Sequence, residues 1–118
     1  MRGKKAFDGQ DYLRAVELLS RVRALDPNDL PTIEMLGSSL FRLGYYGVAK
    51  PLLMEALSND PVDAYLHYAL GTIYLRESYF GDADYHLNRS CSIEPANETY
   101  QLARGNVGKA RAMSRPAA

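Results

Sequence analysis

One segment of the chain has the residue types of a phosphate-binding loop. Residues 105–110 read GNVGKA, and in such loops glycine N–H groups cradle the phosphate while a lysine neutralises its charge. Here the spacing is too short, no hydroxyl-bearing residue follows Lys109, and no strand pattern precedes the segment. The sequence therefore predicts no nucleotide site at this point, and it indicates no cofactor elsewhere.

The other reactive side chains are few and far apart in the sequence. His67 and His86 are the only histidines; they lie 19 residues apart on different expected helices, with no cysteine at ligand spacing, so we expect no metal site. His67 takes a packing position and is interpreted as a packed ring. Cys91 is the only cysteine, which excludes an intrachain disulfide and favours a small core residue over a nucleophile.

Two acidic pairs, Asp60 with Asp63 and Asp82 with Asp84, have the residue type for general acid–base catalysis. Both lie near expected helix starts, where carboxylates stabilise the positive end of the helix dipole. We favour that structural interpretation over catalysis. Because no pattern assembles a catalytic site, the sequence predicts a protein that is not an enzyme.

The size and composition are those of one globular domain. The chain has 118 residues, of which 47% are hydrophobic and 24% charged, and no apolar run approaches the ~18 residues that span a bilayer. The basic start is not followed by an apolar core of a signal peptide. We therefore expect a cytoplasmic protein, or a periplasmic one if an upstream signal was trimmed, with no membrane insertion.

The net charge of zero hides an uneven distribution. Residues 1–25 hold six basic and three acidic side chains, residues 26–98 hold four basic and eleven acidic, and residues 99–118 hold four basic and no acidic ones. An acidic middle argues against nucleic acid along the body of the protein, since phosphates need clustered lysine and arginine. Basic ends against an acidic middle leave two interpretations open: head-to-tail assembly, and ordinary solvated faces, which we favour.

Four residue types recur every 34 residues. A fixed period of this size is typical of helical repeats, in which each unit covers the apolar face of the next. The recurring residues are Pro27, Pro61 and Pro95; Ala15, Ala49 and Ala83; Leu19, Leu53 and Leu87; and Gly3, Gly37, Gly71 and Gly105.

Each period contains the signals of two helices. In residues 30–63, Asp29 is an expected N-cap, apolar residues then follow at steps of three and four, and Gly44 ends the first helix. A second helix is expected from Tyr46 onward. Residues 64–97 repeat the scheme, with Asp63 and Asn97 as the corresponding caps. The recurring glycines and alanines are expected to let the helices approach closely.

This pattern resembles the tetratricopeptide repeat family, whose motif reads W-x₂-L-G-x₂-Y, then A-x₃-F, then P. The chain departs at two motif positions: the leading aromatic is Ile33 or His67, and the phenylalanine is replaced by leucine. The positions that match are Ile33, Leu36, Gly37, Leu40, Ala49, Leu53 and Pro61 in one repeat and His67, Leu70, Gly71, Tyr74, Ala83, Leu87 and Pro95 in the next.

The resemblance implies an all-α fold, a right-handed superhelical array of antiparallel helix pairs with about six or seven helices. We expect a single domain over residues 1–113. It would consist of a partial repeat (1–29), two full repeats (30–63 and 64–97) and a C-terminal helix at about 98–113. Residues 114–118 are expected to form a disordered tail. The incomplete first helix suggests a piece of a longer array or an end that pairs with another copy.

The first helices of successive repeats are expected to line a concave groove that binds a peptide. Aromatic residues beside arginines favour protein interfaces, and Arg42 and Arg76, one period apart, are expected to stack. The set with which some family members clamp chaperone tails is absent, because Glu34, Ser38, Tyr65 and Ala69 stand on the corresponding faces. The expected groove residues are Phe7, Glu34, Ser38, Phe41, Arg42, Tyr65, Tyr68, Thr72, Leu75, Arg76 and Lys109.

The leading functional hypothesis is therefore a protein-interaction module, a scaffold or adaptor for a protein or peptide partner. Two alternatives stay open. The exposed end helices could drive self-association into a homo-oligomer or filament, or the chain could be the recruiting arm of a larger enzyme.

Overall fold

The computed structural model describes residue 3 and residues 11–114. Residues 11–114 form six helices and no strand, which confirms the all-helical prediction. The helix expected near residues 1–8 and all but the first residue of the expected tail lie outside the described residues. None of the described helices is long and apolar enough to cross a membrane. The helices are α2 (Tyr12–Leu25), α3 (Leu30–Arg42), α4 (Tyr46–Asn59), α5 (Ala64–Arg76), α6 (Phe80–Ile93) and α7 (Glu98–Met113).

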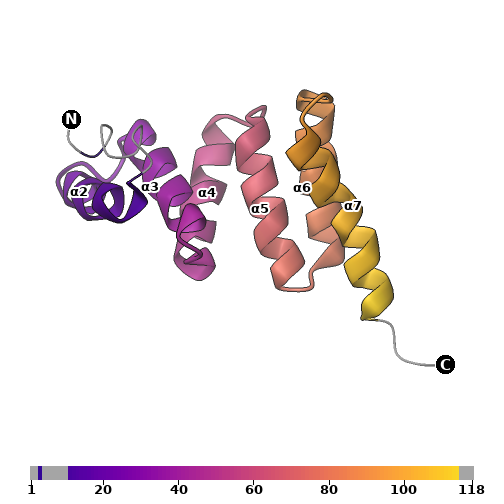
Figure 1. Cartoon of the computed structure of the whole chain (residues 1–118). Coiled ribbons are helices and arrows are strands. Elements are labelled where there is room, and N and C mark those ends of the chain that lie inside the picture. The colour runs from indigo at the N-terminus through magenta and orange to yellow at the C-terminus, as the bar shows by residue number, and fades with distance from the viewer. Residues whose placement is uncertain (1–2, 4–10, 115–118) are drawn as a thin grey trace. The chain divides into compact units, whose positions relative to one another are not determined.

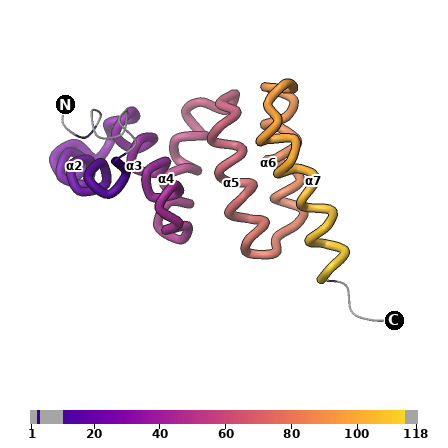
Figure 2. Tube along the Cα trace, in the orientation of Figure 1, coloured from indigo at the N-terminus to yellow at the C-terminus, as the bar shows by residue number. Residues whose placement is uncertain are grey.

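The chain divides into two compact units, the first ending at Pro61 and the second starting at Val62. In the first unit α3 packs against both α2 and α4. In the second unit α6 packs against α5 and α7, and α5 also contacts α7 (Figure 1). Successive helices of the second unit run in opposite directions (Figure 2). As a result α5 and α7, which are both first helices of a repeat, lie on the same side of α6.

The first helix of each repeat begins at a side-chain cap. Asp29, Asp63 and Asn97 each accept the backbone N–H three residues ahead, at 3.1 to 3.2 Å, so the three predicted caps are confirmed. The second helices, α4 and α6, begin at Tyr45 and Tyr79 without such a bond. Each cap satisfies one orphan donor of the first turn and stabilises its helix by about 1 kcal/mol.

The turn between paired helices needs one residue in the left-handed region. Gly44 takes it with φ +85°, and Ser78, one period later, takes it with φ +63°. A side chain in this conformation costs about 1 kcal/mol, so Ser78→Gly is expected to raise the free energy of unfolding by about 0.5–1 kcal/mol. Urea unfolding measures the change. The matched control, Gly44→Ser, is expected to lower stability by a similar amount, and a Ser78→Gly protein no more stable than the parent would contradict this view of the turn.

The glycine ladder marks the points where paired helices cross. A Cβ on Gly71 would stand 2.6 Å from Cγ of Leu87 and 3.2 Å from its backbone nitrogen, and a Cβ on Gly3 would stand 2.7 Å from Cγ of Leu19. At Gly37 the nearest atom would be Leu52 Cβ at 3.1 Å. The predicted close approach is therefore present in all three pairs. The leucines of the second ladder, Leu19, Leu53 and Leu87, are fully buried at these crossings.

The fourth glycine of the ladder, Gly105, is different, because a Cβ there would meet nothing within 4 Å. It lies on the face of α7 that corresponds to the buried faces of α3 and α5. On α7 this face is exposed and consists of Gln101, Arg104, Gly105 and Gly108. The apolar face of α7 is narrow and turns toward α6 and α5 instead, through Tyr100 and Val107, which are 6% and 0% exposed.

Candidate functional site

The second unit places aromatic side chains along α5 at the side that meets α7. The rings of Tyr65 and Tyr68 lie 6.0 Å apart, and Tyr68 packs on Tyr100 of α7 with centroids 5.0 Å apart and planes 30° from parallel. Tyr65 and Tyr68 are half-buried. Both therefore keep part of a large flat ring available, on a backbone that packing holds in place.

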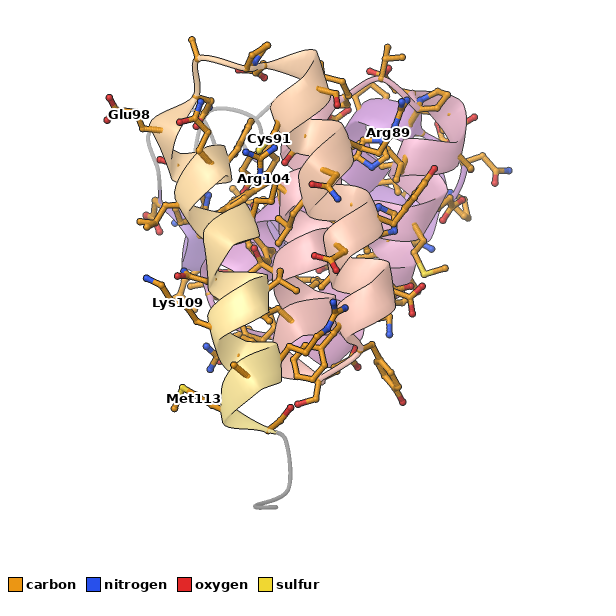
Figure 3. All side chains as sticks on the ribbon, turned by 90° about the vertical axis from the view of Figure 1, so that its right-hand side faces the viewer. Arg89, Cys91, Glu98, Arg104, Lys109 and Met113 are labelled. Carbon is orange, nitrogen blue, oxygen red and sulfur yellow. The ribbon has the colours of Figure 1, made fainter. Side chains whose placement is uncertain are left out.

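On α7 the same side carries an exposed apolar residue followed by polar ones. Leu102 is 65% exposed, and Asn106 and Lys109 follow at helical spacing and are exposed. Figure 3 shows Lys109 pointing away from α6, whereas Arg104 lies on the side of α7 toward α6. We use the name α5–α7 face for Tyr65, Tyr68, Thr72 and Arg76 of α5 together with Leu102, Asn106 and Lys109 of α7.

Tyr100 forms the buried base of this face. It packs in a cluster with Ala64 and Cys91, which Tyr68 and Ile93 cover. Burial raises the pKa of Tyr100 to about 12, and the charge of Glu94 adds to the shift. The phenol therefore stays neutral at any physiological pH. Cys91 is 6% exposed in the same cluster, in agreement with a core role.

A second set of contacts fixes α7 on α6. Val107 is fully buried against Ala83 and Leu87, and Arg111 donates to Asp84 at 2.9 Å. The Arg111 guanidinium also lies over the ring of Phe80, 5.7 Å from its centroid. Of the predicted groove residues, Leu75 belongs to this packing, because it covers the cluster around Val107.

The predicted groove residues of the first unit have different environments. Ser38 and Phe41 are only 3% and 8% exposed, so a ligand reaches them only if neighbouring side chains move. Glu34 is half-buried and Arg42 is exposed, with its guanidinium carbon 5.7 Å from the centroid of the Tyr12 ring. Phe7 lies outside the described residues. Because Arg42 and Arg76 belong to different units, their stacking stays a prediction.

The segments considered for chemistry take structural roles. Residues 105–110 lie inside α7, so they form no phosphate-binding loop. Asp63 is a cap and Asp82 lies in the first turn of α6, as predicted. Asp60, in contrast, is the C-cap residue of α4 and not near a helix start, because α4 continues to Asn59 and the chain needs three further residues before α5. Asp84 is engaged by Arg111.

One contact was missed from the sequence. Nδ1 of His67 lies 3.0 Å from Nδ1 of His86, although the two residues are on separate helices. His67 is 3% exposed, so the prediction of a packed ring is confirmed. The repeat itself held the signal, because Ile33 and Leu52 precede the two histidines by one period. Among the described residues, no group of three metal-ligand side chains comes together.

Comparison with known proteins rests on structure alone. No protein-family model matches the sequence, and no curated protein matches it. The MamA RS-1 ArsTM double mutant superposes with a TM-score of 0.81 at 24% identity, over 92% of this chain and 61% of that one. This chain thus spans less than two thirds of the length of the MamA structure.

Two tetratricopeptide repeat domains match over most of their length. The Arabidopsis OM64 domain has a TM-score of 0.77 at 18% identity, over 92% of this chain and 89% of that one. The first such domain of Spaghetti (RPAP3), bound to the HSP90 peptide SRMEEVD, has a TM-score of 0.77 at 20% identity, over 93% and 87%. Together with the 34-residue ladders and the capped helix pairs, these similarities show that the chain has the tetratricopeptide repeat fold.

Proposed function

We propose that this protein is an adaptor or scaffold that binds a segment of another polypeptide along the α5–α7 face. The observation that carries the proposal is the exposed Leu102 beside the partly open rings of Tyr65 and Tyr68. Tyrosine gives a large contact area at a low cost in side-chain entropy, which is why interfaces favour it. A structural neighbour, the first repeat domain of Spaghetti, holds a peptide, which supports this type of role.

The charges of the α5–α7 face select the chemistry of the ligand. Arg76 and Lys109 are exposed cations on its two helices, and arginine binds carboxylates in a planar, two-pronged geometry. The ligand we infer is a peptide that places one apolar side chain over Leu102 and the tyrosines and a carboxylate near Arg76 or Lys109.

We further infer a binding role without catalysis. The support comes from what the reactive groups do: Cys91 packs against Ala64 and Tyr100, the Ser90 hydroxyl donates to the Leu87 carbonyl, and Asp84 accepts from Arg111. Each of these groups is committed to the packing of α6, and none of them faces the side chains of the α5–α7 face.

Peptides selected from a random display library against the full chain test this proposal. Binding of a fluorescent selected peptide is expected to weaken at least tenfold, or about 1.4 kcal/mol, in the Arg76→Glu/Lys109→Glu protein, because both changes place repulsive charge on the face. Leu102→Ser is expected to weaken binding as well. Fluorescence anisotropy gives the dissociation constants.

The matched control is Arg89→Glu/Arg104→Glu, which changes the net charge equally. Both arginines are exposed, and Figure 3 places them on α6 and on the α6 side of α7. The control is expected to bind within twofold of the parent. Equal loss in both double variants would show a general charge effect, and retained binding in both would place the peptide elsewhere; either result contradicts the proposed face.

A further inference from the structure

The second unit holds two histidines where the first unit holds an apolar pair. Ile33 and Leu52, 0% and 8% exposed, fill the space between α3 and α4. One period later the same positions are His67 and His86, between α5 and α6. The fold thus needs only apolar side chains at this place. Buried imidazoles require a partner for their ring nitrogens, and here each ring is the partner of the other.

The contact is an aromatic cluster built around one hydrogen bond. The two Nδ1 atoms are 3.0 Å apart, and the ring centroids are 5.3 Å apart. Tyr74 of α5 stacks on His86 at 5.5 Å with planes 10° from parallel. Tyr85 of α6 makes edge contacts with both histidines, at 6.4 Å and 5.0 Å. The one carboxylate that acts on His86 is that of Asp82, on the same helix.

Proton counting determines when this bond exists. One ring must carry a proton on Nδ1 and donate it, while the other presents its Nδ1 lone pair. A first added proton can sit on the far nitrogen of the donor ring and leave the bond in place. A second added proton must go to the accepting Nδ1, so two N–H groups and two positive charges then face each other. The bond is lost at that step.

We propose that the His67–His86 contact is a proton-sensitive latch that holds α5 to α6 near neutral pH and releases it in acid. The α3–α4 pair, with Ile33 and Leu52 in the same place, has no such element. Acid is therefore expected to loosen the second unit selectively, and α7 with it, since α7 packs on α6. The proposal does not depend on the peptide-binding role and can be tested on the protein alone.

The titration of His86 supports the direction of this effect. Its pKa is lowered from 6.5 to about 4, first by burial and then by the charge of His67, while Asp82 acts in the opposite direction. The unfolded chain therefore binds more protons than the folded one between about pH 6.5 and pH 4. Stability from this group is complete above pH 6.5 and falls as the pH decreases toward 4.

Hydrogen exchange of the full chain at pH 7 and pH 5, corrected for the intrinsic exchange rate, tests the latch. Protection of amides in α5 and α6 is expected to fall about tenfold, which allows for the half-exposed state of His86. Protection in α3 and α4 is expected to change less than twofold. Asp29 and Asp63 cap helices in both units, so titration of the caps affects both pairs and does not mimic the result.

The double variant His67→Ile/His86→Leu installs the apolar pair of the first unit and is expected to abolish the selective loss. Equal loss in both helix pairs, or an acid loss that persists in the double variant, would overturn the proposal. NMR titration of the parent gives a second readout that needs no variant, because the chain has two histidines in all. Two rings that titrate independently near pH 6.5 would also overturn it.

Discussion

Leu87→Ala is expected to lower the free energy of unfolding by about 2–5 kcal/mol, the range for truncating a large aliphatic core side chain. Leu87 is fully buried at the crossing of α5 and α6, and its Cγ lies 2.6 Å from the point where a Cβ on Gly71 would stand. The side chain also supports α7, because Val107 packs on it. Urea unfolding of the variant measures the loss.

The same crossing makes a sharper test in combination. Gly71→Ala alone is expected to destabilise, because overpacking costs about 1–3 kcal/mol and exceeds the gain of about 1 kcal/mol from helix propensity. Added to Leu87→Ala, however, Gly71→Ala is expected to stabilise, since its methyl group then fills vacated space. Gly105→Ala, on the open face of α7, is the control and is expected to gain about 1 kcal/mol. Additive effects of Gly71→Ala and Leu87→Ala would contradict the close crossing.

Tyr100→Ala is expected to cost about 3–5 kcal/mol, as for other large aromatic side chains of a core, and to remove peptide binding at the same time. Tyr100 is 6% exposed and joins α7 to Tyr68 of α5 and to Cys91 of α6. Without it the two halves of the α5–α7 face are no longer held together. Thermal unfolding and peptide anisotropy measure the two effects.

Tyr100→Phe is the matched variant, because it keeps the ring and removes only the hydroxyl. Its stability is expected to stay within about 1.5 kcal/mol of the parent, the net worth of one hydrogen bond, with peptide binding retained. If Tyr100→Ala destabilised the chain but left peptide affinity unchanged, α7 would not be part of the binding face.

The sequence predicted the local structure well because each signal acts within a few residues. Asp29, Asp63 and Asn97 cap the helix that follows them, and Gly44 supplies the left-handed residue at the end of α3. The ladder of glycines and leucines also predicted the helix crossings, since both residue types recur with one period and therefore meet in each pair.

Contacts between helices were harder to predict. The pattern placed His67 and His86 on inward faces but could not show that their nitrogens meet, because that depends on the rotamers of both rings. Likewise, helical spacing put Ser38 and Phe41 on a ligand-facing side, yet neighbouring side chains cover them. Side-chain packing, which is set in three dimensions, decides between a partly open ring such as Tyr65 and a buried one such as Phe41.

The most direct test of the binding face is an amide chemical-shift map of the ¹⁵N-labelled full chain titrated with a selected peptide. The account predicts that the largest shifts gather on Tyr65, Tyr68, Leu102 and Asn106, and that they disappear with the Arg76→Glu/Lys109→Glu protein. Shifts that gather instead around Asn88 and Arg89 on α6, or that persist in the double variant, would contradict it.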